Sequence, residues 1–134
     1  MRDWIAGLKP GPRVGVLATQ GELPSAYQSA AVAIVGGTFA AYGGHNALEP
    51  AARGCAVVVG PHVEAIEESL EALAREGAVL RAGDAAEGGS AVLSLARSPD
   101  ALRRMGEGAA RAAAAASDSA RRSLQALERF GLTP

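Results

Sequence analysis

Four short runs of apolar residues set the strongest constraint on how this chain can fold. They cover residues 14–17, 31–35, 55–59 and 78–80, and glycine or proline residues bound them. Each run is continuously apolar and does not alternate with polar residues, which is typical of strands buried on both faces of a parallel sheet. Helix-like stretches separate the runs. This order of strand, helix and strand predicts a three-layer α/β sandwich.

Apolar residues at helical spacing mark the helices. In the stretch 63–76, Ile66, Leu70 and Leu73 recur at that spacing, with acidic residues on the other face. Further helices are expected over 23–30, 46–53 and 84–97, then from Pro99 through an alanine tract to a pause at 117–119, and then over a final helix. We expect a single domain over 1–134, with strand and helix units over 13–83 and C-terminal helices over 84–131.

Charge and composition exclude several classes of function. The net charge is −1 and Lys9 is the only lysine, so no basic surface for nucleic acid or for an anionic membrane is indicated. Cys55 is the only cysteine, which excludes an internal disulfide, and the two histidines cannot hold a zinc ion alone. We therefore expect no metal and no cofactor, and a structural role for Cys55. Since no apolar run reaches the ~18 residues of a membrane span, we expect a cytoplasmic protein.

The glycine-rich segment 36–50 carries the densest candidate chemistry. It follows the second predicted strand and so would lie at the carboxyl end of that strand, where open α/β sheets bind their ligands. Its glycine pairs would let backbone amides approach a ligand closely. A helix start at Asn46 would offer free N–H groups to a phosphate. Glu49 could accept two hydrogen bonds from a ribose diol.

A purely structural role is open for the same residues. Asn46 and Glu49 have the spacing of a capping box, in which the two side chains satisfy backbone N–H groups, and spacing alone favours this alternative. His45 could donate to a phosphate or bridge backbone carbonyls. Two other turns, 19–22 and 60–62, could border the same crevice or act as ordinary caps and turns.

The motifs of the chain resemble those of the 3-deoxy-D-manno-octulosonic acid (Kdo) transferases. The resemblance rests on Gly21-Glu22-Leu23, on Val35-Gly36-Gly37-Thr38, on the string from Gly43 to Ala52 (GGHNALEPAA), and on Gly60-Pro61-His62. It runs from about Val14 to the C-terminal helices and corresponds to the later part of the family's second, donor-binding domain. It implies a Rossmann-like parallel sheet, a truncated version of the C-terminal domain of the GT-B architecture.

The resemblance also implies a function. Kdo transferases move Kdo from CMP-Kdo to the lipid A precursor in lipopolysaccharide assembly, without a metal at the centre of sugar transfer. By this likeness the chain binds a nucleotide-sugar donor, CMP-Kdo, and Glu49 holds its ribose. The other donor-binding residues that the likeness implies are Gly21, Glu22, Gly36, Gly37, Thr38, Gly43, Gly44, His45, Asn46 and His62.

The chain departs from the family pattern at several positions. Ala40-Ala41 stands where the family usually has a proline-containing segment, Ala18 where it has an acid, and Ala65-Ile66 where it has an Asn-Phe pair. The family's acceptor domain, with its catalytic carboxylate, has no counterpart here. The resemblance therefore predicts no catalytic residue in this chain and little activity for the chain alone.

Three functions follow from these expectations. The first is a glycosyltransferase domain that works with a separate acceptor domain at the inner face of the inner membrane, reaching the membrane only through the lipid acceptor. The second is a nucleotide-binding module without catalysis, and the third is a structural subunit or remnant. An unpaired sheet edge also predicts a homo-oligomer.

Overall fold

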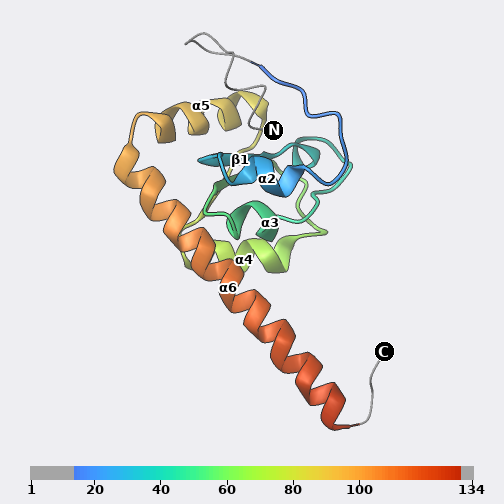
Figure 1. Cartoon of the computed structure of the whole chain (residues 1–134). Coiled ribbons are helices and arrows are strands. Elements are labelled where there is room, and N and C mark those ends of the chain that lie inside the picture. The colour runs from blue at the N-terminus through green and yellow to red at the C-terminus, as the bar shows by residue number, and fades with distance from the viewer. Residues whose placement is uncertain (1–13, 131–134) are drawn as a thin grey trace.

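The computed structural model describes residues 14–130, so Trp4 and the remaining residues of 1–13 and 131–134 lie outside it. Helices and strands alternate along the chain as the sequence predicts (Figure 1). In chain order the elements are α2 (Leu23–Tyr27), β1 (Val32–Val35), the 3-10 helix η1 (Gly36–Phe39), α3 (Leu48–Ala51), β2 (Ala56–Val59), α4 (Glu67–Arg75), β3 (Val79–Arg81), α5 (Ala85–Ala96) and α6 (Pro99–Arg129).

The three strands form one open parallel sheet in the order β1-β2-β3. Val32 pairs with Ala56 across the first ladder, and Val57 pairs with Val79 across the second. All four residues of the central strand β2 are fully buried, which explains why its sequence is continuously apolar. The predicted parallel α/β sheet is therefore confirmed.

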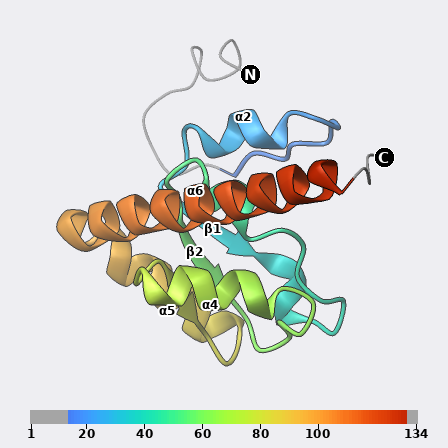
Figure 2. The ribbon, with the colours of Figure 1, turned by 90° about the horizontal axis from the view of Figure 1, so that it is seen from below.

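Helices cover both faces of the sheet. Val57 packs in a cluster with Leu73 of α4 and with alanines of α3 and α6, whereas Ala56 packs in a second cluster with Leu95 of α5. Because successive residues of a strand point to opposite faces, the two clusters lie on opposite sides of the sheet. Figure 1 shows α5 on one side and α3 and α4 on the other, and Figure 2 shows α6 running across the strands.

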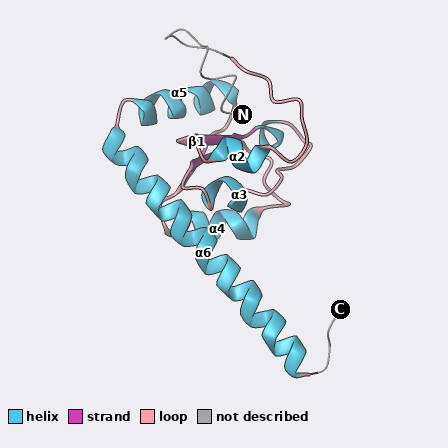
Figure 3. Cartoon of the chain, viewed as in Figure 1, coloured by secondary structure: helices cyan, strands magenta, loops and turns pink. Residues whose placement is uncertain are grey.

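The prediction of a strand over 14–17 is wrong. These residues form a loop that leads to α2 (Figure 3), and the side chains of Val14 and Val16 are 96% and 88% exposed. A strand needs a neighbouring strand to satisfy its backbone N–H and C=O groups. Within the described part of the chain, β1 pairs only with β2, and no strand pairs with residues 14–17. The outer edge of β1 therefore stays unpaired within the described part of the chain.

The predicted pause at 117–119 is also wrong, because α6 continues through it as one helix of 31 residues. This segment contains no glycine or proline, the residues that break helices most strongly. Asp118 forms an ion pair with Arg121, and the Ser123 hydroxyl donates to the Ser119 carbonyl over 3.2 Å. Asp118 and Ser119 are thus each paired with a residue one helical turn further along α6. Among residues 14–130 no helix, including α6, has the length and apolar character to cross a membrane.

Two glycines let the first half of α6 approach the rest of the molecule closely. A Cβ atom on Gly106 would collide with the Gly54 carbonyl oxygen, and one on Gly108 would collide with the Glu76 carbonyl oxygen. The backbone of α6 therefore lies directly against the turns that follow α3 and α4. The second half of the helix projects beyond the sheet (Figure 1).

Candidate functional site

The carboxyl ends of β1 and β2 form the edge of the sheet at which the predicted site lies. The two strands end at Val35 and Val59, which are paired in register. The turn that begins at Gly36 therefore lies beside the turn that begins at Gly60. The backbone N–H of His62 donates to the carbonyl oxygen of Thr38 over 2.9 Å, which joins the two turns directly.

Thr38 holds this edge together through its side chain. Its hydroxyl donates to the Val35 carbonyl oxygen over 2.6 Å and accepts from the Gly60 N–H, also over 2.6 Å. The side chain is fully buried. Thr38 is one of the residues predicted to bind the donor, but its hydroxyl is already engaged and has no exposed surface to offer a ligand.

Close packing explains two of the predicted donor-binding glycines, Gly37 and Gly44, and also Gly60 of the neighbouring turn. A Cβ atom added to Gly60 would lie 2.5 Å from the carbonyl oxygen of Thr38. A Cβ atom added to Gly37 would lie 2.6 Å from the carbonyl oxygen of Gly43. At Gly44 it would lie 2.6 Å from the Thr38 methyl group. At Gly37 and Gly60 the close atoms belong to backbone, which cannot move aside, so these two positions require glycine whether or not a ligand binds. Gly36, by contrast, faces open space.

The next segment leads from these glycines into α3. His45 and Asn46 are exposed, and the Asn46 side-chain oxygen accepts from the Leu48 N–H over 3.0 Å. The helix itself begins at Leu48, after Ala47, and has four residues. Asn46 therefore caps the turn before the helix, one residue earlier than a standard N-cap. So short a helix contributes little dipole.

Glu49 lies in the first turn of α3 with its side chain half-buried. Within residues 14–130 its carboxylate makes no hydrogen bond or ion pair, so the reciprocal bond of a capping box is missing. The capping alternative is wrong for Glu49, although Asn46 does cap. A half-buried carboxylate with unused acceptor positions is suited to a ligand that brings its own hydroxyl donors.

Tyr27, at the end of α2, lies close enough to Glu49 to respond to its charge. Burial raises the pKa of the Tyr27 phenol, and the negative charges of Glu49 and Cys55 raise it further. Helix α2 packs against α3, which brings the two side chains together. The sequence alone gives no signal for this pair, because 21 residues separate Tyr27 from Glu49.

Cys55 fixes the end of α2 against the sheet. Its side chain is buried, and its sulfur lies 3.3 Å from the Ala30 carbonyl oxygen and 3.4 Å from the Tyr27 carbonyl oxygen. Burial raises the pKa of the thiol, so it stays protonated at neutral pH and can donate to either carbonyl. These contacts support the structural role that the sequence predicts for it.

The raised pKa predicts how Cys55 affects stability. The folded chain keeps the thiol proton to a higher pH than the unfolded chain, so this stabilisation is present below about pH 8.5 and is lost as the pH rises through the folded-state pKa. The free energy of unfolding of the native chain should therefore exceed that of Cys55→Ala by less at pH 10 than at pH 7. Urea denaturation of both proteins at the two pH values measures this. A difference that stays constant or grows would contradict it.

Gly21 and Glu22 lie in the turn that leads into α2. The Thr19 hydroxyl donates to the Glu22 carboxylate, and both residues are exposed. They border a mainly apolar hollow of about 590 Å³ formed by residues 15–19, Glu22 and Ala26. The described structure thus places Gly21 and Glu22 at the start of α2, and within residues 14–130 no hydrogen bond joins them to the glycine turns.

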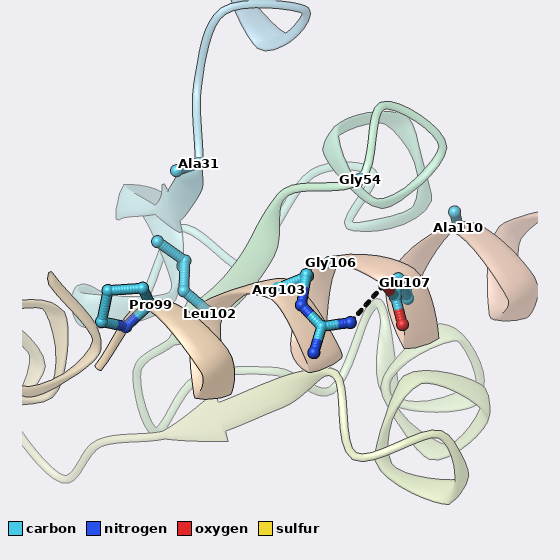
Figure 4. Close-up of a pocket in the computed structure, with 8 residues that line it drawn as sticks. All are labelled: Ala31, Gly54, Pro99, Leu102, Arg103, Gly106, Glu107 and Ala110. Atoms are coloured by element: carbon cyan, nitrogen blue, oxygen red, sulfur yellow. Dashed lines mark hydrogen bonds and ion pairs between the residues drawn. The ribbon is translucent and has the colours of Figure 1, made fainter.

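A second hollow lies at the opposite edge of the sheet, beside the amino ends of β1 and β2. Figure 4 shows this space, of about 520 Å³, between α6 and the residues Ala31 and Gly54. Its charged side chains, Arg103 and Glu107, pair with each other over 3.0 Å. Nor do residues 14–130 gather three or more potential metal ligands anywhere. The carboxyl-end edge therefore remains the candidate site.

Known proteins include relatives of this chain. No family model matches the chain. It is 42% identical over 122 residues to the 3-deoxy-D-manno-octulosonic acid transferase of Bordetella pertussis, a match that covers 90% of this chain and 28% of that protein. A shorter match, 45% identical over 58 residues, links it to the same transferase of Aquifex aeolicus and covers 43% of this chain and 16% of that one.

A solved structure has the same fold. The crystal structure of the C-terminal CMP-Kdo binding domain of WaaA from Acinetobacter baumannii superposes with a TM-score of 0.67 and 31% identity. The match covers 72% of this chain and 50% of that one, so the chain spans about half of the solved domain. In sequence and in fold, the chain is thus similar to the C-terminal part of the 3-deoxy-D-manno-octulosonic acid transferases.

Proposed function

We propose that the chain is a donor-binding part of a Kdo transferase and holds the nucleotide of CMP-Kdo at the carboxyl ends of β1 and β2. Two findings support this. The Acinetobacter domain that shares its fold binds CMP-Kdo, and the full-length relatives are transferases. These relatives do not favour a non-catalytic module or a structural remnant.

The carboxylate of Glu49 carries the proposal. Its side chain is half-buried, a few residues after exposed His45 and Asn46, and no group within residues 14–130 uses its acceptor oxygens. A ribose presents two neighbouring hydroxyl donors, which a carboxylate accepts in a bidentate manner. Holding the ribose there would place the phosphate toward the exposed end of the glycine turns.

The phosphate would lie against Gly36, His45 and Asn46. Gly36 is exposed and faces open space, so its backbone can approach a ligand. The side chains of His45 and Asn46 are exposed on the same segment, and His62 on the neighbouring turn is half-buried. In this proposal Gly37, Gly43 and Gly44 shape the backbone, and Gly21 and Glu22 border the outer side of the site beside α2.

The rest of the transfer reaction would come from elsewhere. The chain spans 28% of the Bordetella relative, so the acceptor site and the catalytic carboxylate belong to a part outside this match. Catalysis by positioning two substrates needs both halves of a cleft. We propose an acceptor domain, or a second copy of this chain, as the partner, at the cytoplasmic face of the inner membrane.

Chemical-shift mapping of the ¹⁵N-labelled chain with CMP tests the proposed function. Backbone amides of Gly36, His45, Asn46 and Glu49 should shift and reach saturation, while amides at the hollow near Gly54 and Gly106 should not. UDP should need a higher concentration, because the solved relative binds a cytidine nucleotide. Shifts confined to the hollow, or no saturable shift at millimolar CMP, would contradict the proposal.

A further inference from the structure

Thr38 is an unusual residue for the core of this fold. Within residues 14–130 it is the one buried polar side chain, among a core otherwise made of Val, Leu, Ile, Met, Cys and Ala residues. Burying a hydroxyl costs free energy unless it is hydrogen-bonded, and a valine of nearly the same shape avoids that cost. Compared with valine, threonine therefore adds only the two hydrogen bonds of its hydroxyl at this position.

Those two bonds connect segments that are far apart in the sequence. The acceptor, Val35, ends β1, and the donor, Gly60, begins the turn after β2. The hydrogen bond from the His62 N–H to the Thr38 carbonyl oxygen joins the same two turns. If the hydroxyl were absent, the buried Gly60 N–H would lose the only side-chain partner described for it.

The methyl group of Thr38 reaches a third segment. It packs so closely on Gly44 that a Cβ atom there would lie 2.6 Å from it. Gly44 is buried and is followed directly by His45, Asn46 and the turn into α3. One side chain therefore contacts the three segments that carry the exposed groups of the candidate site.

We propose that Thr38 is a positioning residue for nucleotide binding: its hydroxyl locks the turn after β1, which leads on to Gly44 and His45, to the turn after β2. Thr38 does not touch the ligand, because its side chain is fully buried. This role rests on the proposed function, since it assumes that CMP binds at this edge.

Two substitutions separate the hydroxyl from the shape. Thr38→Val keeps the branched side chain and removes the hydrogen bonds, whereas Thr38→Ser keeps the hydroxyl and removes the methyl group. Amide hydrogen exchange at Gly60 and His62 reports on the lock and needs no ligand. CMP affinity, measured by titration of the whole chain, reports on the site. A urea denaturation curve for each variant shows whether it is folded.

In Thr38→Val we expect exchange at Gly60 to be at least about tenfold faster and CMP affinity to fall about fivefold, the loss of roughly one hydrogen bond. Thr38→Ser should keep slow exchange at Gly60 and bind CMP within about twofold of the native chain. If Thr38→Val does not fold, Thr38→Ser decides alone, and loss of either property would overturn the role.

Other results would also overturn it. Unchanged exchange at Gly60 in Thr38→Val would show that no lock depends on the hydroxyl. Faster exchange with unchanged CMP affinity would leave Thr38 a structural residue only. If the native chain binds no CMP, the proposed function fails and the positioning role fails with it, while the exchange data still show separately whether the lock exists.

Discussion

The substitution Gly60→Ala should destabilise the chain by about 3 kcal/mol or prevent it from folding. The added Cβ atom would lie 2.5 Å from the carbonyl oxygen of Thr38, 2.7 Å from its carbonyl carbon and 2.8 Å from the ring of Phe39. Most of these atoms belong to backbone, which cannot swing aside as a flexible side chain can. The two turns would have to separate, and the bonds from Gly60 and His62 to Thr38 would break.

Gly36→Ala is the matched control, because Gly36 follows β1 as Gly60 follows β2. Gly36 is exposed, and nothing lies within 4 Å of a Cβ atom added to it. Its substitution should change the free energy of unfolding by no more than about 0.5 kcal/mol. Urea denaturation of the native chain and both variants gives the comparison. Equal stability of the two variants would show that the turns are not packed as described.

The sheet and its main helices could be predicted from the sequence, because burial leaves a clear pattern there. The central strand β2 is buried on both faces, and its sequence is correspondingly apolar throughout. The helix expected over 84–97 is observed as α5, with Asp84 as its N-cap accepting from the Glu87 N–H. In both cases a local pattern is enough to specify the local structure.

The two errors come from interactions that a local pattern does not contain. The run 14–17 is as apolar as the true strands, but strand formation depends on pairing, and this run does not pair with the open edge of β1. The residues 117–119 have modest helix propensity, but the 31-residue helix around them overrides it. Strand pairing, a tertiary effect, explains the first error, and the cooperativity of a long helix explains the second.

The meeting of the two glycine turns could be predicted from the sequence, but the packing roles of their residues could not. The glycine turns do meet at the carboxyl ends of β1 and β2. Yet Gly37 and Gly60 are required by backbone packing, Gly44 packs against side chains of Ile66 and Thr38, and Thr38 is buried. The sequence alone does not distinguish a glycine that admits a ligand from one that admits a neighbouring backbone. Whether the remaining exposed residues bind the donor stays a prediction.

The second large effect is expected at the proposed ribose contact. Glu49→Gln keeps the size of the side chain but removes its charge and replaces one acceptor oxygen with a donor. A bidentate bond to the two ribose hydroxyls is then no longer possible. Since hydrogen bonds to charged groups contribute about 1.5–3 kcal/mol, CMP should bind at least about tenfold more weakly. Stability should hardly change, because the Glu49 carboxylate has no partner within residues 14–130.

Glu68→Gln is the control for a general effect of charge. Glu68 is an exposed carboxylate in the first turn of α4, and it too makes no hydrogen bond or ion pair within the described residues. Both variants lower the negative charge by one. An equal loss of affinity in both would indicate long-range electrostatics in place of a contact.

The central claim is that Glu49 belongs to a working nucleotide site. The most direct test is a calorimetric titration with CMP of three proteins: the native chain, Glu49→Gln and Glu68→Gln. The account predicts saturable binding to the native chain, a loss of tenfold or more in Glu49→Gln, about 1.4 kcal/mol, and affinity within about twofold of native in Glu68→Gln. Binding that Glu49→Gln leaves unchanged, or a native chain that binds no CMP at millimolar concentration, would contradict it.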